Sequence, residues 1–296
     1  MPTPPVPTVL DAEQVTDVCT HHGEGPVWDA SAGVLRFVDV VAGGLMTFDP
    51  ATGAVRRRTL GPVVACVRPL RDGGLVVALE RSVAVLDDPD DEAVAPRTVA
   101  TLPDGAGVRC NDGGCDPAGD LLLGTMAYDE SPGAGSLYRV PAEGPVQAVI
   151  TGVTISNGFC FDPTGTFAYW TDTPTGRVER LTFAADGSVA AREPFVTVDP
   201  AAGHPDGLTV DAEGGVWVAL WAGSAVHRYA PDGTLDVVVR VPARQVSCPA
   251  FGGPGLDDLY VTTSRQGLAA GEDPQAGALF RVTPGVRGLP VLPFAG

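Results

Sequence analysis

Four polar side chains stand at the same distance ahead of an aspartate in four separate parts of the chain. Each lies five residues before that aspartate, in segments that read GEGPVWD, NDGGCD, NGFCFD and DGLTVD. The four side chains are Glu24, Asn111, Asn157 and Asp206. Asn-Gly and Asp-Gly are ordinary turn dipeptides, so each could be only a turn residue. Four occurrences of one spacing favour a shared site over four independent turns.

Two carboxylates and two amides, without histidine or cysteine, describe an all-oxygen site. Carboxylates brought close together repel each other unless a cation lies between them. Oxygen ligands suit hard divalent cations such as Ca²⁺, Mg²⁺ and Mn²⁺, while Zn²⁺ and Fe²⁺ stay open because geometry and availability also decide. With few protein ligands, such an ion keeps positions for water and substrate and can act as a Lewis acid. The pattern therefore predicts one divalent metal ion with open coordination positions.

The elements that position these residues recur along the chain. Segments 27–53, 113–140, 159–187 and 208–233 each contain an apolar strand, a turn of the Asp-x-x-Gly type, a second apolar strand, a polar loop and a third strand. Weaker copies surround Asp72 and Pro254, which gives six units spaced by about 45 residues, the length of one propeller blade. A solenoid has shorter coils, and a β-sandwich has no reason for sixfold repetition. We therefore predict an all-β fold, a six-bladed β-propeller with four-stranded antiparallel blades.

The composition is typical of such a fold. The 296 residues are 44% hydrophobic and include 38 Gly and 28 Pro, as expected for many short strands joined by turns. No linker divides the units, so we predict a single domain over residues 15–296, preceded by a Pro-rich N-terminal tail over residues 1–14. Equal offsets in a propeller then place the four polar side chains at one level of the central channel.

Charge and hydropathy exclude several classes of partner. The net charge is −17, opposite to the balance expected of a nucleic-acid binder. The sequence shows no apolar run long enough to cross a membrane, and its first residues lack the basic and apolar regions of a secretory signal. Six scattered cysteines without a C-x-x-C pair predict reduced, mostly buried thiols and a cytoplasmic location. We expect a monomer or a weak homo-oligomer.

Four segments resemble the signature motifs of the SMP-30/gluconolactonase/regucalcin-like (LRE) family of metal-dependent sugar lactonases: GEGPVWD, RCNDGGCDPAGDLLLGTM, SNGFCFDPTGTFAYWTDT and PDGLTVDAEGGVWVA. The resemblance runs from about residue 15 to residue 290 and implies a six-bladed propeller that holds one divalent metal ion. It implies metal ligation by Glu24, Asn157 and Asp206, with Asp206 also helping to deprotonate the attacking water. The implied reaction is hydrolysis of a sugar lactone whose carbonyl is polarised by the metal ion.

The same resemblance implies that Arg109 and Asn111 bind the substrate, Arg109 through a forked pair of hydrogen bonds. In regucalcin-like members an acid after the GTM segment binds sugar hydroxyls, and here GTMAYDE offers Asp129 or, less favoured, Glu130. Because this segment departs from the family pattern, the sugar stays open between gluconolactone and a pentonolactone. Trp221 stands where some members have Tyr and is a candidate wall of the pocket.

Other residues have structural explanations. Asp112 precedes Gly113 and is expected in a turn or behind the ligands, and His204 is expected in a loop that could line the pocket. The family pattern gives no role to His21 or His22. We assign turn roles to four aspartates and core positions to three tryptophans: Asp29, Asp116, Asp162, Asp211, Trp28, Trp170 and Trp217.

Two classes of function follow. No Gly-x-Ser-x-Gly elbow, Walker A segment or dinucleotide fingerprint occurs. The first class is a metal-dependent sugar lactonase, or a related propeller esterase or phosphotriesterase. The second is a propeller that binds calcium or a partner without chemistry. The set of Glu24, Asn157, Asp206 and Arg109 favours the first class, since a scaffold has no need of all four.

Overall fold

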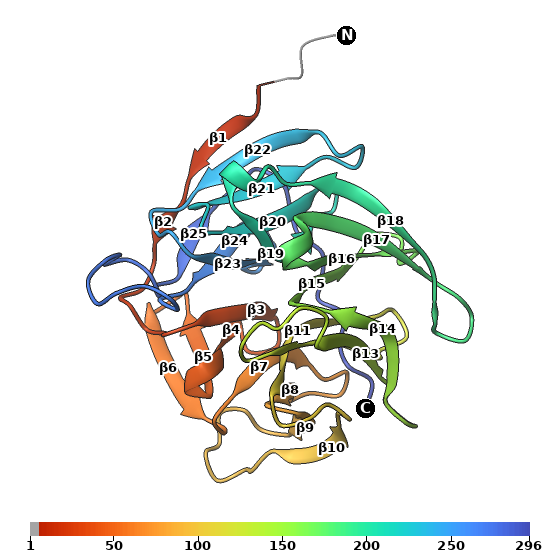
Figure 1. The fold of residues 1–296 in the computed structure, drawn as a ribbon. Coiled ribbons are helices and arrows are strands. Elements are labelled where there is room, and N and C mark those ends of the chain that lie inside the picture. Colours follow the sequence, from red (N-terminus) through yellow and green to blue (C-terminus); the bar gives the residue numbers. More distant parts are fainter. Residues whose placement is uncertain (1–5) are drawn as a thin grey trace.

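Six β-sheets are arranged in a ring around a central axis (Figure 1). The structure is a computed structural model and describes residues 6–296. Over this range the helical segments are three short 3₁₀ helices: η1 (Val40–Ala42), η2 (Thr173–Thr175) and η3 (Pro200–Ala202). None of the described helices is long and apolar enough to cross a membrane. The predicted all-β, six-bladed propeller with four-stranded antiparallel blades is confirmed.

Each blade is built mainly from strands that follow one another along the chain. Blade 1 contains β3 (Gly23–Asp29), β4 (Val34–Asp39), β5 (Gly44–Asp49) and β6 (Ala54–Thr59), and blade 2 contains β7 (Val64–Pro69), β8 (Leu75–Leu79), β9 (Ser82–Leu86) and β10 (Arg97–Thr101). Blade 3 contains β11 (Val108–Cys115), β12 (Leu121–Ala127), β13 (Gly135–Val140) and β14 (Gln147–Val153), and blade 4 contains β15 (Ser156–Phe161), β16 (Ala168–Asp172), β17 (Arg177–Phe183) and β18 (Val189–Thr197). Blade 5 contains β19 (His204–Val210), β20 (Val216–Trp221), β21 (Ala225–Tyr229) and β22 (Leu235–Arg240), and blade 6 contains β23 (Val246–Gly252), β24 (Asp258–Thr263) and β25 (Phe280–Val282).

Two strands from the start of the chain complete the last two blades. β1 (Thr8–Asp11) pairs in parallel with β22, and β2 (Glu13–Gln14) pairs antiparallel with β25 as the fourth strand of blade 6. These strands lie within the segment expected as a Pro-rich tail, of which residues 1–5 fall outside the described residues. Because blade 6 takes its outer strand from the opposite end of the chain, the ring is held closed by backbone hydrogen bonds.

The innermost strands of neighbouring blades pack side by side around the axis, and β3 meets β23 where the ring closes. All six innermost strands contain a β-bulge, where their register with the second strand shifts. The shifts fall between Glu24 and Val27, Val64 and Cys66, Cys110 and Gly113, Asn157 and Phe159, Pro205 and Leu208, and Val246 and Cys248. A bulge bends its strand and re-aims the side chains beside it. The equal sequence offsets therefore correspond to one repeated backbone feature.

The residues assigned to structure occupy the expected places. Trp28, Trp170 and Trp217 are buried, and the six cysteines are free, four of them buried. The four turn aspartates accept hydrogen bonds from backbone N–H groups of the turn that follows each of them. Asp211 additionally pairs with the buried Arg228, Oδ2 to Nε, at 2.7 Å. These contacts stabilise the turn between the first and second strands in four of the six blades.

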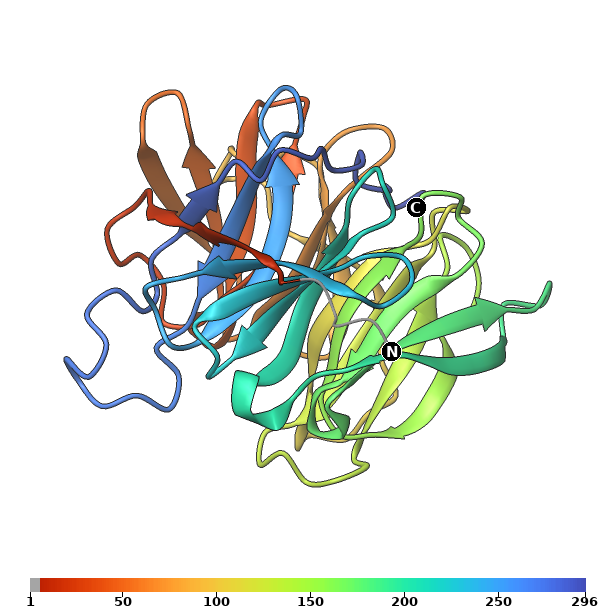
Figure 2. The same cartoon turned by 90° about the horizontal axis from the view of Figure 1, so that it is seen from above.

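One loop departs from the ring of sheets. The connection between β24 and β25, residues 264–279, is drawn in blue and extends outward beyond the sheets (Figure 2). Its first residues lie beside the start of β3, because the backbone N–H of Arg265 donates to the carbonyl of His21 at 2.7 Å. Blade 6 thus contributes loop residues to the same end of the channel as Glu24.

Gly158, directly after Asn157 in the bulge of β15, has a φ of 49°. A Cβ atom there would lie 2.5 Å from Leu208 Cγ and 3.0 Å from the carbonyl oxygen of Asp206. Gly152 offers a matched control, because it has a φ of 72° but no atom within 4 Å of an added Cβ. Both glycines therefore have a left-handed backbone, but only at Gly158 would an added Cβ contact its neighbours.

Gly158→Ala is expected to lower the free energy of unfolding by about 2–5 kcal/mol, because left-handed strain costs about 1–2 kcal/mol and overpacking about 1–3 kcal/mol. Gly152→Ala is expected to lower the free energy of unfolding by the strain contribution alone, about 1–2 kcal/mol. Urea unfolding of the two variants and the wild type measures both losses. Equal losses at the two positions would contradict close packing of the bulge against blade 5.

Candidate functional site

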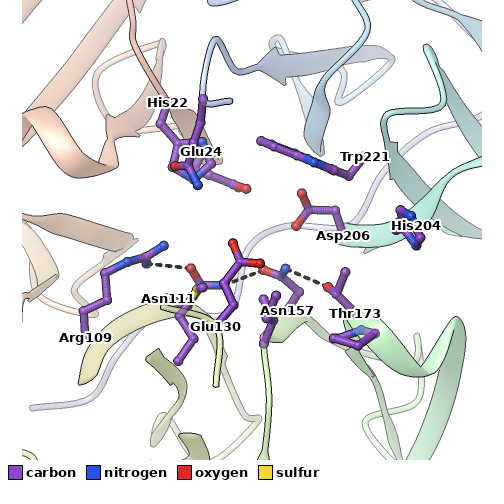
Figure 3. Close-up of a pocket in the computed structure, with 14 residues that line it drawn as sticks. His22, Glu24, Arg109, Asn111, Glu130, Asn157, Thr173, His204, Asp206 and Trp221 are labelled. Carbon is purple, nitrogen blue, oxygen red and sulfur yellow. Dashed lines mark hydrogen bonds between the residues drawn. The ribbon is translucent and has the colours of Figure 1, made fainter. Parts of the chain in front are cut away.

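A cavity of about 310 Å³ opens at the end of the channel where the bulges lie (Figure 3). Seven of the residues singled out in the sequence line it: Glu24, Arg109, Asn111, Asn157, His204, Asp206 and Trp221. They come from the innermost strands of four blades and from the second strand of blade 5. The structure therefore brings the four equally spaced side chains to one place.

Two carboxylates face this cavity from blades 1 and 5. The side chains of Glu24 and Asp206 are almost fully buried, at 7% and 4% exposure. One Glu24 oxygen accepts a hydrogen bond from the N–H of Gly25 at 3.0 Å, whereas Oδ1 of Asp206 has no hydrogen-bond partner within residues 6–296. Figure 3 shows the Asp206 carboxylate directed toward the space between Glu24 and Asn157.

Burial and nearby negative charges raise the pKa of both acids. Loss of water, followed by the negative charge of Asp112, raises the pKa of Glu24 to about 8. Burial, followed by the charges of Glu24 and Asp112, raises the pKa of Asp206 well above its usual range. A divalent cation between the two carboxylates would remove this conflict, since it favours the charged forms that burial disfavours.

A chain of hydrogen bonds of defined direction crosses the site. Nη1 of Arg109 donates to Oδ1 of Asn111 at 2.7 Å, and Nδ2 of Asn111 donates to Oδ1 of Asn157 at 2.8 Å. Nδ2 of Asn157 donates to the hydroxyl of Thr173 at 2.9 Å, and this hydroxyl donates to the carbonyl of Pro205 at 2.8 Å.

Because the single proton of Thr173 is committed to a carbonyl, the hydroxyl can only accept from Asn157. This fixes the amide of Asn157 with its oxygen toward the cavity. Asn111 is oriented in the same way, since its Nδ2 also donates to the carbonyl of Ser156 at 2.9 Å. The sequence analysis missed Thr173, which lies in the 3₁₀ helix η2 rather than in an innermost strand.

The donor set fits a hard divalent cation. The described residues contain no group of three or more His, Cys, Asp or Glu side chains spaced to hold a metal ion. A metal ion here therefore needs amide oxygen beside the carboxylates of Glu24 and Asp206, and the oriented Oδ1 of Asn157 supplies it. The buried Asp206 oxygen without a partner is the second observation that fits such an ion, because buried polar atoms are normally satisfied.

Asp112 lies behind the cavity rather than in its wall. Its two oxygens accept hydrogen bonds from the N–H groups of Gly113 and Gly158, at 2.7 and 3.0 Å. Nη2 of Arg68 lies 3.7 Å from Oδ1 of Asp112. Asp112 thus ties the bulge of blade 3 to that of blade 4.

Asp129, predicted to bind substrate, does not line the cavity, and Glu130 does. Asp129 is exposed, and its carboxylate accepts a hydrogen bond from the N–H of Ser131 in the turn after β12. Glu130 follows with a φ of 57°, a left-handed conformation that is rare outside glycine. This reversal of the backbone sends successive side chains in different directions and directs Glu130 inward (Figure 3).

The wall opposite the chain of hydrogen bonds is aromatic. Trp221 and His22 form an edge-to-face pair with ring centroids 5.8 Å apart and an interplanar angle of 87°. Burial, followed by the charge of Arg109, lowers the pKa of His22 to about 3, so its imidazole is neutral at physiological pH. His204 also lines the cavity but is exposed to solvent. The remaining lining residues are Met126, Ile155, Pro174 and Gln266.

The arrangement can orient a small polar molecule in a partly apolar pocket. Arg109 and Asn111 present hydrogen-bonding groups on one side, and Trp221 presents an apolar face on the other. The buried acid Asp206 lies between them and can take a proton when its carboxylate is ionised, a form that a bound cation would favour. The geometry therefore suits hydrolysis of a compact oxygen-rich ester.

Comparison with known proteins gives a consistent result. Residues 22–265 match the family described as the SMP-30/Gluconolactonase/LRE-like region. The chain is 39% identical to the pentonolactonase XacC of Haloferax volcanii over 289 residues, covering 95% of this chain and 97% of that protein. It is 34% identical to a 6-deoxy-6-sulfogluconolactonase of Pseudomonas putida, covering 93% and 95% of the two chains. The crystal structure of a calcium-binding protein, regucalcin, from Agrobacterium tumefaciens superposes with a TM-score of 0.91 at 30% identity, covering 98% of this chain and all of that chain.

Glu24→Gln is expected to flatten the pH dependence of stability in metal-free buffer. A carboxyl whose pKa is about 8 when folded and 4.5 when unfolded stabilises the fold only while it is protonated. That stability is complete below pH 4.5 and is lost as the pH rises through 8. We expect the wild-type unfolding temperature in EDTA to fall by several degrees more than that of the variant between pH 5 and pH 9.

Glu143→Gln, at an exposed position, serves as the control and is expected to follow the wild type. Parallel profiles for wild type and Glu24→Gln would contradict a buried, uncompensated carboxylate at Glu24.

Proposed function

This chain belongs to the SMP-30/gluconolactonase/LRE-like family, and from that premise we propose that it is a metal-dependent lactonase that opens a sugar lactone to the aldonic acid. One observation carries the proposal. The buried carboxylates of Glu24 and Asp206 and the oriented amide of Asn157 meet in a cavity that Arg109 and Asn111 also line. The relatives named pentonolactonase and 6-deoxy-6-sulfogluconolactonase support a lactone as substrate class.

Glu24, Asn157 and Asp206 are the proposed metal ligands. A bound divalent cation would polarise the lactone carbonyl and stabilise the negative charge that develops on its oxygen. The all-oxygen donor set suits Ca²⁺, Mg²⁺ or Mn²⁺, with Zn²⁺ and Fe²⁺ as further candidates. The regucalcin of Agrobacterium tumefaciens is described as calcium-binding, which supports a divalent ion of this kind.

The remaining polar residues act on the substrate and on water. Asp206 accepts a proton from the attacking water through the carboxylate oxygen that does not bind the metal ion. Arg109 and Asn111 hold the oxygens of the lactone, since both side chains line the cavity and are fixed by their mutual hydrogen bond. Glu130 takes the role first assigned to Asp129 and accepts hydrogen bonds from sugar hydroxyls.

A calcium-binding propeller without catalysis is the second candidate. It shares the ligand set with the first and is supported by the same calcium-binding relative. The two differ in whether Arg109 and the free oxygen of Asp206 serve a substrate. A panel of sugar lactones, simple esters and a phosphotriester, assayed by acid release with EDTA and with each metal added back, separates lactonase, esterase and pure metal binding.

Asp206→Asn is expected to lower kcat for lactone hydrolysis by at least about 100-fold, the usual contribution of a general base. Circular dichroism of the variant should match the wild type, because the amide keeps the volume of the side chain. Asp186→Asn, in an exposed turn between β17 and β18, is the matched control and should keep full activity. Wild-type turnover by Asp206→Asn would overturn the role given to this residue.

Thr173→Val is expected to weaken metal binding about 10-fold, because partners behind the ligands commonly contribute that much to metal affinity. Valine keeps the shape of threonine but leaves the Asn157 amide free to rotate its oxygen away. Thr175→Val in the same 3₁₀ helix is the control, since Thr175 is exposed and its hydroxyl bonds to backbone groups, the carbonyl of Asp172 and the N–H of Arg177. Calorimetric titration with metal measures both, and equal affinities for the two variants would contradict the orienting role of Thr173.

A further inference from the structure

His22 is held where the first and last blades meet. Its backbone N–H donates to Oδ1 of Asp39 at 2.9 Å, and its carbonyl accepts from the N–H of Val40 at 2.9 Å. It also forms an isolated antiparallel bridge with Ser264 of blade 6. Three backbone constraints thus fix the imidazole two residues before Glu24, in the wall of the cavity.

The hydroxyl of Ser264 fixes one edge of the imidazole ring. Nδ1 of His22 lies 2.8 Å from Oγ of Ser264, and this oxygen accepts a hydrogen bond from the N–H of Gln266 at 3.0 Å. Ser264 is fully buried, and the described residues give its proton no acceptor other than Nδ1. Donation from Ser264 to Nδ1 leaves no buried hydroxyl unpaired, so the ring proton of the neutral imidazole resides on Nε2.

The N–H group at Nε2 is a hydrogen-bond donor for which the described residues provide no acceptor. Among residues 6–296 it forms no hydrogen bond, while the ring to which it belongs lines the cavity. Trp221 packs against this ring in the edge-to-face pair, and Arg109 and Asn111 lie across the cavity. A donor beside an indole matches a sugar ring, which has apolar C–H faces and hydroxyls at its edges.

We propose that His22 determines specificity by donating from Nε2–H to a hydroxyl oxygen of a sugar lactone that packs against Trp221. The proposal rests on the proposed lactonase function and adds the residue that distinguishes a hydroxylated lactone from a bare one. It also gives a role to the second histidine of the His-His pair, whereas His21 is exposed and lies outside the cavity.

The test compares D-xylono-1,4-lactone with γ-butyrolactone, which has the same ring without hydroxyls. His22→Phe keeps an aromatic ring beside Trp221 and removes both nitrogens. It is expected to raise KM for xylonolactone about threefold to tenfold, the usual worth of one hydrogen bond, and to leave kcat and the KM for butyrolactone within about twofold. Each lactone is also measured as a competitor of the other, so butyrolactone gives a value whether or not it turns over.

Two further variants keep the result interpretable. His22→Gln retains a side-chain N–H donor and is expected to recover most of the xylonolactone KM, even if His22→Phe folds poorly. His21→Phe is the matched control and should resemble the wild type. Equal changes for both lactones, or an unchanged KM for xylonolactone in His22→Phe, would overturn the role of His22 alone. A folded, metal-loaded wild type that hydrolyses neither lactone would overturn the lactonase function and this inference together.

Discussion

Repulsion between two buried carboxylates is the constraint on which this site depends. Glu24 and Asp206 are removed from water, and neither forms an ion pair with a Lys or Arg within the described part of the chain. The nearby guanidinium groups are engaged elsewhere, Arg109 with Asn111 and Arg68 with Asp112 and the carbonyl of Gly113. A fold stabilises such an arrangement poorly by itself, because each carboxylate makes ionisation of the other less favourable. The cavity therefore lacks an internal salt bridge at these two carboxylates, which is consistent with the divalent cation proposed above.

The propeller supports this constraint through its backbone. A bulge recurs at the same level in all six innermost strands, yet only four blades place a carboxylate or amide side chain there. The corresponding residues of blades 2 and 6 are Ala65 and Ser247, and Ser247 uses its hydroxyl for the carbonyl of Gly23. Sixfold repetition thus supplies more positions than the chemistry needs. The unused positions are filled by small residues that let the neighbouring strands approach.

The repeat and the equal offsets could be read from the sequence because both follow from a local pattern. Strand alternation and Asp-x-x-Gly turns predict the blades, and the five-residue offset predicts which side chains share a level. Glu130 could not be chosen over Asp129 in this way, since the choice depends on a left-handed φ at a residue that is not glycine. The sequence pattern also could not predict the roles of Thr173 and His22. Their roles arise from hydrogen bonds to Asn157 and to Ser264, the latter separated from His22 by 242 residues.

The cavity therefore has two parts that differ in how they are held. Glu24, Asn157 and Asp206 are set by bulges in the innermost strands, where an added Cβ at a neighbouring glycine meets the next blade. Glu130 comes from the turn after a second strand, Trp221 from the end of a second strand, and His22 from the segment that joins the first and last blades. A change in the second group alters the shape and polarity offered to a substrate without moving the bulges. Glu130, Trp221 and His22 are consequently free to vary on this scaffold separately from the proposed metal ligands.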